Sequence, residues 1–512
     1  MSTVQLDALL PREDFEIDEK SSQTSLSQTF KISDLESGAF FYNSLRKPDF
    51  QRETSDWSTG RICDFISSFL DGDLIPAIIL WNSGKYTFAI DGAHRLSALI
   101  AWVNDDYGDG FFSNAFFDHN IPEEQKSIAE KTRNKVNREI GSYKEHTEAV
   151  RNPSKANPII LERAQKLGYI AIQLQWVNGG SDKAEASFFK INQKAVTISD
   201  TEIDLLISRK KPNAIAARAI VRSGTGHKYW SKFSSGRQTE IQELAKDIND
   251  ILFTPKLKSP VKSIDLPIAG QGYSARSLSL ILDFVNITND FDSKTALDDD
   301  IDGQLTINTL KKSKRIAQRI LGNHPGSLGL HPAVYFYSIT GKHQPTAFLA
   351  IIELIKEFET KDLYKKFLSV RFDFENYLLK NKQISNQVTL KYGSGRKGYR
   401  QLKDVFMTII NYLLAGETED SVTIKLKENY NYLNFEYVES YDSDSQDFSA
   451  GIKSAIFIRE AIVNSVKCKI CNCMVHRNSI SFDHIERVED GGKGVADNGQ
   501  VAHFYCNSTL KN

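Results

Sequence analysis

The sequence predicts an α/β domain at the front of the chain, a mainly helical middle and a small C-terminal module that depends on a metal. Three observations support this prediction. Apolar runs typical of strands alternate with helix-period patterns over residues 31–210, whereas 211–435 carries mainly helical periodicity. Four of the five cysteines lie within the last 45 residues. A segment that short cannot bury a large apolar core, so it needs a metal or a similar staple.

Length and composition limit the class of protein. At 512 residues the chain is too long for one ordinary core, and 40% hydrophobic with 25% charged residues is typical of globular domains. The formal net charge is −1, so any nucleic-acid surface must be a local patch. The N-terminus has no signal-peptide pattern, and no apolar run approaches the ~20 residues that span a bilayer. We therefore expect a cytoplasmic protein with no membrane partner.

Composition also suggests the domain boundaries. Residues 1–30 are polar and Ser-rich, which favours a flexible arm, and 31–210 would form the α/β domain. Residues 211–435 would form the helical middle region. Between 436 and 449 there are five acidic residues and no basic one, so 436–451 is predicted to be a solvated acidic linker. Residues 452–512 would then form a separate compact unit.

Within the α/β domain, the apolar runs 74–81 and 86–90 are joined by a turn and predict two neighbouring strands. The sequence DGAH follows at once, and 95–102 opens a helix. A helix is expected at 62–70, a further strand at 171–176 and a further helix at 184–192. In the middle region, we expect helices at 277–284, 345–358 and 402–414.

The C-terminal cysteines have the spacing of a zinc site. Cys468-x2-Cys471 and His503-x2-Cys506 form two knuckles about 30 residues apart, and together supply the Cys₃His ligand set that Zn²⁺ accepts. Cys473 is a spare thiol that would replace Cys471 if the knuckle register differed. The alternative is a group of buried free thiols.

Between the knuckles lie FDHI, then a Gly-Gly pair, then Asp-Asn. This order resembles the HNH (ββα-metal) nuclease family over about 45 residues. The resemblance implies that Asp483 and Asn507 hold one Mg²⁺ or Mn²⁺ ion, that His484 is the general base and that Asn498 orients the loop carrying it. The residue types suit the chemistry, because a neutral imidazole can activate water near neutral pH, and a carboxylate with an amide leaves the metal open positions for phosphate.

Some residues of this module have alternatives that the sequence leaves open. His484 would otherwise be a strand histidine, Asn498 a turn residue and Asn507 a helix cap. His476 lies near the site without a motif position and is expected at the surface. Two features depart from the commonest family pattern: His503 stands where many members have cysteine, and the proline that often follows Asp-His-Ile is missing. A zinc knuckle without catalysis also remains open.

The front domain carries a second pattern, in which PDFQR and a tryptophan precede an apolar strand and the sequence DGAHR, and SFFKINQKAVTISDTE follows farther on. These segments resemble the ParB/sulfiredoxin-like family and its DGQQR motif over about 160 residues. The resemblance implies a nucleotide- or DNA-binding α+β domain and, in some members, hydrolysis of a nucleoside triphosphate. Ala93 replaces a family glutamine, which puts hydrolysis in doubt more than binding.

The residue pattern itself favours a phosphate site, because a strand, a glycine turn and a helix N-terminus meet at one point. The predicted binding residues are Gln51, Arg52, Asp91, Gly92, His94, Arg95 and Asn192. The alternatives are an N-cap for Asp91, a salt bridge for Arg95 and a helix cap for Asn192. Trp57 is expected in the core.

Two basic segments of the middle region carry weaker signals. GSGRKG at 393–398 precedes the expected helix 399–414 but lacks P-loop spacing, so a flexible basic loop is favoured. KKSKR at 311–315 is expected on a solvated helix face, with a DNA backbone contact as the alternative.

Taken together, the two resemblances predict a DNA endonuclease regulated or targeted by its front domain, of the kind found in bacterial defence against phage. The expected cofactors are Zn²⁺, Mg²⁺ or Mn²⁺ and a nucleoside triphosphate. The expected partner is foreign or phage DNA, and homo-oligomerisation is left open. The alternative is a ParB-like DNA-binding or NTP-hydrolysing regulator whose zinc module is not catalytic.

Overall fold

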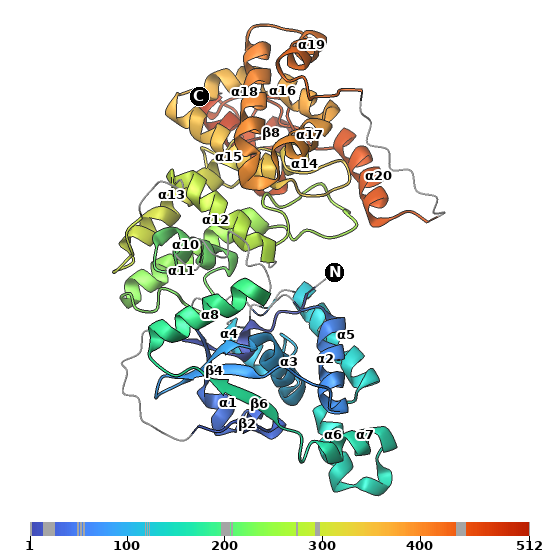
Figure 1. The fold of residues 1–512 in the computed structure, drawn as a ribbon. Helices are drawn as coiled ribbons and strands as arrows, with labels where there is room; N and C mark the ends of the chain where they lie inside the picture. Colours follow the sequence, from blue (N-terminus) through green and yellow to red (C-terminus); the bar gives the residue numbers. More distant parts are fainter. Residues whose placement is uncertain are drawn as a thin grey trace. The chain divides into compact units, whose positions relative to one another are not determined.

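A computed structural model describes residues 3–13, 26–48, 51, 54, 57–117, 119, 121, 123–195, 205, 208–272, 275–291, 297–436 and 447–510 (Figure 1). The chain forms two compact units. The first comprises Met1–Arg209 with Thr225–Tyr229, and the second comprises Lys210–Gly224 with Trp230–Asn512.

The first unit is built on a mixed six-stranded sheet. Its strand order is β1-β3-β5-β4-β6-β2, and the strands are β1 (Arg12–Glu13), β2 (Thr29–Phe30), β3 (Leu45–Pro48), β4 (Ile78–Asn82), β5 (Thr87–Asp91) and β6 (Ile172–Trp176). Neighbours pair in parallel except β4 with β5 and β2 with β6, which are antiparallel. The three strands predicted in this region are therefore present, although the first begins at Ile78 rather than at residue 74.

Helices cover both faces of this sheet. On one face, α8 (Ser181–Ala195) packs on Trp81, Phe88 and Ile90. On the other face, Leu80 and Ala89 belong to the larger core with α2 (Thr59–Asp71) and α3 (Ala93–Asn104). Figure 1 shows α8 on one side of the sheet and α2, α3 and α5 (Glu123–Glu139) on the other. Because β4 is covered on both faces, its sequence is continuously apolar instead of alternating.

Shorter helices complete the first unit. They are α1 (Phe40–Ser44), α4 (Phe111–Phe116), α6 (Tyr143–Arg151) and α7 (Pro158–Lys166). Ser142 caps α6 by accepting a hydrogen bond from the Glu145 backbone N–H, and the Glu145 carboxylate accepts one from the Ser142 N–H, which forms a capping box.

The N-terminal residues differ from the expected flexible arm. Residues 3–13 are described, and Val4, Leu9 and Leu10 are fully buried in the core of the first unit. Exposure was expected because residues 1–30 are polar and serine-rich taken together. These polar residues are concentrated after residue 10, whereas the apolar side chains among residues 4–10 pack in the core of the first unit.

The second unit is mainly helical, as predicted. Its helices are α10 (Pro212–Val221), α11 (Ser235–Phe253), α12 (Ala275–Asn289), α13 (Gln304–Ile320), α14 (Pro332–Tyr335), α15 (Pro345–Thr360), α16 (Tyr364–Lys380), α17 (Gln383–Tyr392), α18 (Tyr399–Leu414), α19 (Glu419–Asn429) and α20 (Ala450–Val463). The expected helices 277–284, 345–358 and 402–414 lie within α12, α15 and α18. None of the helices in the described part of the chain combines the length and apolar character needed to cross a bilayer.

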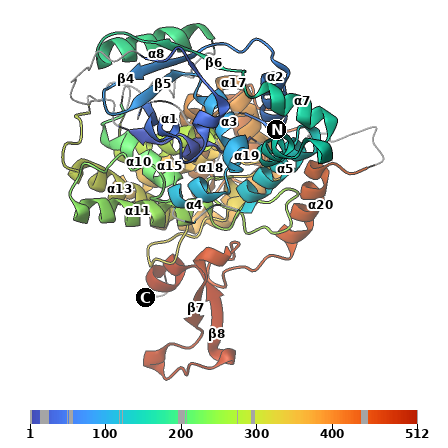
Figure 2. The same ribbon diagram turned by 90° about the horizontal axis from the view of Figure 1, so that it is seen from below.

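The C-terminal residues belong to the same compact unit as these helices. The Tyr505 N–H donates to the Ser327 carbonyl at 3.1 Å, and Asn478 Nδ2 donates to the Thr254 carbonyl at 2.7 Å. Beyond these contacts, the antiparallel ribbon of β7 (Ser481–His484) and β8 (Gly499–Ala502) extends away from the helices (Figure 2). Most of the predicted acidic linker, residues 437–446, lies outside the described residues. The boundaries at 435, 451 and 452 remain predictions, and the last two fall within α20.

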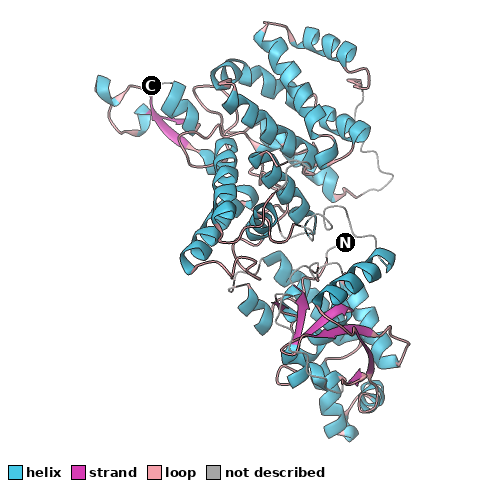
Figure 3. Ribbon diagram, turned by 60° about the vertical axis from the view of Figure 1, so that its left-hand side comes forward, coloured by secondary structure: helices cyan, strands magenta, loops and turns pink. Residues whose placement is uncertain are grey.

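Figure 3 shows where the two types of secondary structure lie. Among the described residues, strands occur only in the sheet of the first unit and in the C-terminal ribbon. The small ribbon has no large sheet to support it, so its packing must come from the residues at its base.

Candidate functional site

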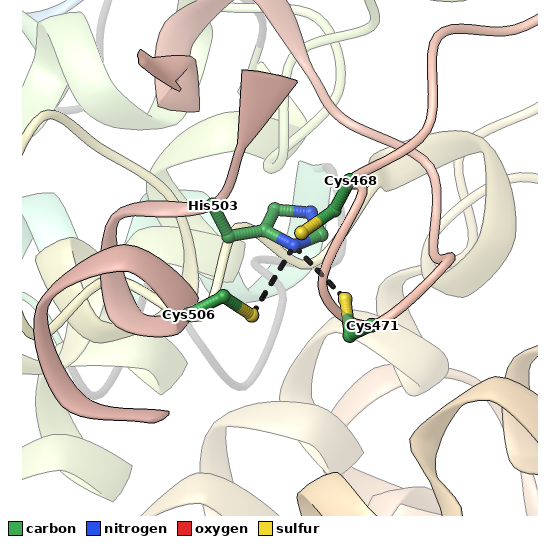
Figure 4. A group of neighbouring side chains, drawn as sticks. All are labelled: Cys468, Cys471, His503 and Cys506. Carbon is green, nitrogen blue, oxygen red and sulfur yellow. Dashed lines mark hydrogen bonds between the residues drawn. The ribbon is translucent and has the colours of Figure 1, made fainter. Parts of the chain in front are cut away.

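The predicted zinc ligands meet at the base of the ribbon. One ligand atom from each of Cys468, Cys471, His503 and Cys506 lies within 4.8 Å of every other (Figure 4). Cys471 Sγ is 3.3 Å and Cys506 Sγ is 3.8 Å from His503 Nδ1. This arrangement suits one tetrahedral Zn²⁺ ion, so the cluster could bind zinc.

The first knuckle has the backbone geometry of a tight turn. The Cys468 N–H donates to the Cys473 carbonyl, and the Asn472 N–H donates to the Cys468 carbonyl, both at 2.9 Å. Asn472 has φ +56°, a conformation that asparagine tolerates better than most residues. The Lys469 N–H donates to the Val501 carbonyl in β8, which ties the knuckle to the ribbon.

The surroundings prepare His503 as a ligand. The ring is fully buried, and Nε2 lies 3.0 Å from the Met474 carbonyl. A carbonyl can only accept, so Nε2 carries the proton and Nδ1 presents its lone pair to the cluster. Burial works to lower the pKa of His503, but hydrogen bonds with the thiols of Cys468 and Cys471 raise it overall.

The thiols also influence one another. Hydrogen bonds from Cys468, Cys473 and Cys506 hold the pKa of Cys471 well below its usual value, which favours the thiolate form that binds metal. Cys473, the spare thiol, is not among the four clustered ligands, and its Sγ donates to the Cys471 carbonyl at 3.4 Å.

A buried arginine of the helical region holds the segment on which the cluster packs. Arg371 of α16 is fully buried and donates to the carbonyls of Leu328 (2.6 Å) and Gly329 (3.2 Å) and to Glu375 (2.7 Å). Gly329 has φ +61°, and a Cβ there would lie 2.5 Å from His503 Cδ2. The His503 ring therefore packs directly on Gly329, and Arg371 holds the Gly329 carbonyl by a hydrogen bond.

The ribbon determines where the predicted catalytic residues face. Asp483 pairs with Gln500, and His484, the last residue of β7, pairs with Gly499. Consecutive strand residues face opposite sides, and burial follows this rule, since Asp483 is 7% and Phe482 76% exposed. Strand geometry alone therefore does not direct Asp483 and the half-buried His484 to one face.

Asn507 lies on the Asp483 side of the ribbon. Its Nδ2 donates to Ser481 Oγ at 2.7 Å and to the Phe482 carbonyl at 3.2 Å. These two bonds hold the side-chain amide of Asn507 through its nitrogen. Its Oδ1 accepts no hydrogen bond from the described residues. Asp483 Oδ2 accepts from Gln500 Nε2 at 2.6 Å.

Ser481 and Gln500 were missed in the sequence. The available signal was strand register, because Ser481 lies two residues before Asp483 on the same face, and Gln500 is the cross-strand partner of Asp483. That register depends on the length of the intervening loop, which the sequence pattern did not specify.

Asn498 closes the loop that follows His484. Its Oδ1 accepts from the Glu486 N–H at 2.7 Å, and its Nδ2 donates to the carbonyls of Glu486 (3.1 Å) and Lys493 (3.0 Å). The Ile485 N–H donates to the Asn498 carbonyl at 2.8 Å. The side chain thus ties both ends of loop 485–498 together.

The expectation that His476 lies at the surface is wrong, because the side chain is fully buried. It caps a short turn by accepting from the Asn478 N–H. Its ring packs edge-on to His331 of the helical region, with the ring centroids 5.6 Å apart. It belongs to the packing between the module and the helices.

The DGAHR segment of the first unit lines a cavity of about 650 Å³. Among the residues around it are Gln51, Trp57, Arg61, Asp91, Gly92, His94, Arg95 and Phe188. β5 ends at Asp91, Gly92 has φ +94°, and α3 begins at Ala93, so the predicted strand–glycine–helix arrangement is present.

Within this cavity, Arg95 pairs with Asp91 at 2.5 Å and also donates to the Pro76 carbonyl, so it forms the salt bridge that was the alternative to a phosphate contact. Trp57 packs against the core of the first unit, as predicted, but is only partly buried. Its ring also stacks on His94 with the ring centroids 5.8 Å apart, and the Arg61 guanidinium lies 4.8 Å from the centroid of the Trp57 ring. These aromatic and cationic groups make the cavity suitable for a planar or anionic ligand.

Two predicted binding residues fall where the structure gives no side-chain position. Arg52 lies outside the described residues. Asn192 lies in α8, but its side chain is also outside them.

The basic segments of the middle region have different surroundings. Lys311, Lys314 and Arg315 pair with Glu240, Asp247 and Glu359, which leaves α13 without a simple cationic face. The GSGRKG loop forms a short helical turn at 395–397 before α18.

Removing one clustered ligand should release the metal. We expect Cys506→Ala to lose the bound zinc, because three ligands no longer complete the tetrahedron, whereas Cys473→Ala should keep it. Zinc per chain, measured by elemental analysis of purified protein, tests this. Equal zinc in the two variants would contradict the assigned ligand set.

Gly329→Ala should weaken zinc binding by about 10–100-fold, because its Cβ would displace His503, the ligand packed against it. Competition with a chelator measures the affinity. Gly416→Ala is the matched control, since Gly416 also has positive φ, but a Cβ there would meet no atom within 4 Å. A zinc affinity of Gly329→Ala equal to that of Gly416→Ala would contradict the role of Gly329 in positioning His503.

Comparison with known proteins links the first unit to a described family. Residues 32–206, about a third of the chain, match the family model for the GmrSD restriction endonuclease, N-terminal domain. No curated protein and no solved structure gives a significant match. The first unit is therefore similar to the N-terminal domain of a restriction-type endonuclease.

Proposed function

We propose that the protein is a metal-dependent DNA endonuclease in which the C-terminal ribbon is an HNH site. The observation that carries this proposal is the joint placement of Asp483 and Asn507 on one side of a ribbon whose base is the Cys₃His cluster. The similarity of the first unit to a restriction endonuclease domain supports DNA as the substrate.

Asp483 and Asn507 are the proposed ligands of one Mg²⁺ or Mn²⁺ ion. Their oxygens suit a hard cation, and the two nitrogen-side bonds of Asn507 leave its Oδ1 for the metal. Gln500 Nε2 donates to Asp483 Oδ2 and so orients the carboxylate. When bound, the ion would stabilise the negative charge that builds on the phosphate and the leaving oxygen.

His484 is the proposed general base. Its position at the end of β7, followed by the loop that Asn498 ties together, places the imidazole at the edge of the ribbon. In the reaction, the imidazole takes a proton from water, the water oxygen forms a bond to phosphorus, and the opposite P–O bond breaks. The leaving oxygen then takes a proton from solvent.

We propose that the first unit senses a nucleotide or a DNA feature and thereby regulates or targets cleavage, with a role in defence against phage DNA. The 650 Å³ cavity, the Trp57–His94 stack and Arg61 support ligand binding. Ligand phosphate would reach Arg95 only by competing with Asp91. Turnover of a nucleoside triphosphate and assembly into oligomers are open parts of this proposal.

The second candidate is a ParB-like regulator with a zinc module that does not cut. The separate faces of Asp483 and His484 favour it, because a joint metal–base site would need the end of β7 to adjust. The two candidates differ in one outcome, which is cleavage.

His484→Ala should lower cleavage of plasmid DNA in Mg²⁺ or Mn²⁺ by about 10²–10⁴-fold, since the general base is lost. Zinc content and melting temperature should not change. His324→Ala, at a histidine of the same unit outside the ribbon, is the matched control. Wild-type cleavage by His484→Ala would exclude this base, and no cleavage by the wild type in any metal or nucleotide would favour the regulator.

Trp57→Ala should weaken nucleotide binding about tenfold or more, as expected when an aromatic stacking surface is lost. Equilibrium binding of ATP, GTP and CTP to the full chain measures this. Trp176→Ala in β6, outside the cavity, should bind as the wild type does. Equal affinities in both variants would remove Trp57 from the binding site.

A further inference from the structure

Asp7, in the N-terminal segment, lies at the centre of a buried charge cluster. Its side chain is 1% exposed, and the side chains of Arg12 and Lys47 are fully buried. Asp7 Oδ1 accepts from Lys47 Nζ at 2.5 Å and from Arg12 Nη2 at 2.8 Å. Asp7 and Arg12 precede residue 32, so they lie outside the segment that matches the restriction endonuclease domain.

The same three side chains contact the segment that leads from β3 to α2. The Thr54 N–H donates to Asp7 Oδ1 at 3.1 Å, and Lys47 Nζ donates to Thr54 Oγ1 at 2.5 Å. Arg12 Nη1 donates to the Gln51 carbonyl. The cluster therefore fixes this segment at two described positions, Gln51 and Thr54.

Backbone hydrogen bonds extend this attachment to the cavity. The Leu6 N–H donates to the Thr54 carbonyl, and the Val4 N–H donates to the Trp57 carbonyl, both at 2.9 Å. Gln51 and Trp57 line the 650 Å³ cavity. Residues 4–12 thus hold Gln51 and Trp57, two residues that line the cavity.

The cluster can do this only while the Asp7 carboxylate is in place. Asp7 accepts hydrogen bonds from Lys47, Arg12 and the Thr54 N–H, so removal of its charge would weaken all three contacts and let Arg12 and Lys47 shift. Both cations contact Gln51 or Thr54, so their movement would transmit directly to the wall.

We propose that Asp7 is a positioning residue for the cavity, and that residues 4–12 are a functional part of the binding site although they lie outside the matched domain. The ligand part of this proposal rests on the nucleotide-sensing function proposed above. The positional part does not, because the cluster acts on the wall whether or not a ligand is present.

Hydrogen exchange of the full chain tests the positional part without any ligand. In Asp7→Asn, peptides covering 48–58 should exchange about tenfold faster than in the wild type, because Thr54 loses its charged acceptor. Peptides covering β4 and β5 should be unchanged. Asp109→Asn, which breaks the pair with Arg133 away from the cavity, is the matched control and should leave 48–58 unchanged.

Equilibrium binding of ATP, GTP and CTP tests the ligand part. Asp7→Asn should lose about tenfold in affinity, because the side chain that holds Thr54 is altered, whereas Asp109→Asn should bind as the wild type does. If the wild type binds none of the three nucleotides, the sensing proposal fails, and the exchange result still decides the role of Asp7.

Unchanged exchange at 48–58 in a folded Asp7→Asn variant would overturn the proposal. If that variant does not fold, Thr54→Val decides, since it removes only the hydroxyl that Lys47 contacts. Faster exchange confined to 48–58 in Thr54→Val would support the cluster as the anchor of the wall. Unchanged exchange there would overturn it.

Discussion

The Cys₃His cluster is the interaction on which the C-terminal module depends. The ribbon of β7 and β8 has four residues in each strand and buries few apolar side chains, so its base must be held by other means. The four ligand atoms join the turn at 468–471 to the segment 503–506 that follows β8. Everything the ribbon carries, including Asp483, His484 and Asn507, takes its position from that junction.

The module is also joined to the helical region, and this connection passes through the metal ligands. His503 packs on Gly329, whose carbonyl accepts from the buried Arg371 of α16. The Tyr505 N–H reaches the Ser327 carbonyl in the same segment. A shift of α16 would therefore displace Gly329 and the His503 ring that packs on it. The ribbon would be reached through His503. This provides a physical route by which the helical region could influence the proposed nuclease site.

In the first unit, buried ion pairs and backbone hydrogen bonds hold the residues that line the cavity. Its cavity is formed where β5 turns through Gly92 into α3, on a sheet that is packed on both faces, so that side of the site is rigid. Gln51 and Trp57, which also line the cavity, are held by the buried Asp7 cluster and by the backbone of residues 4–6. The Cys₃His cluster in one unit and the buried ion pairs in the other each hold residues of the proposed sites.

The sequence by itself determined the features that depend on local pattern. The strand–glycine–helix turn at Asp91–Ala93 follows from apolar runs and a glycine, and the four clustered ligands follow from their spacing. Tertiary structure decided what depends on partners distant in the chain. Gln500 meets Asp483 only through the register of β7 with β8, Arg95 donates to the Pro76 carbonyl, and Trp57 stacks on His94 while it packs against the core. Residues 4–10 were predicted to be flexible because no local pattern in the sequence indicates a contact with a distant residue. Lys47, which pairs with Asp7, lies 40 residues away from it.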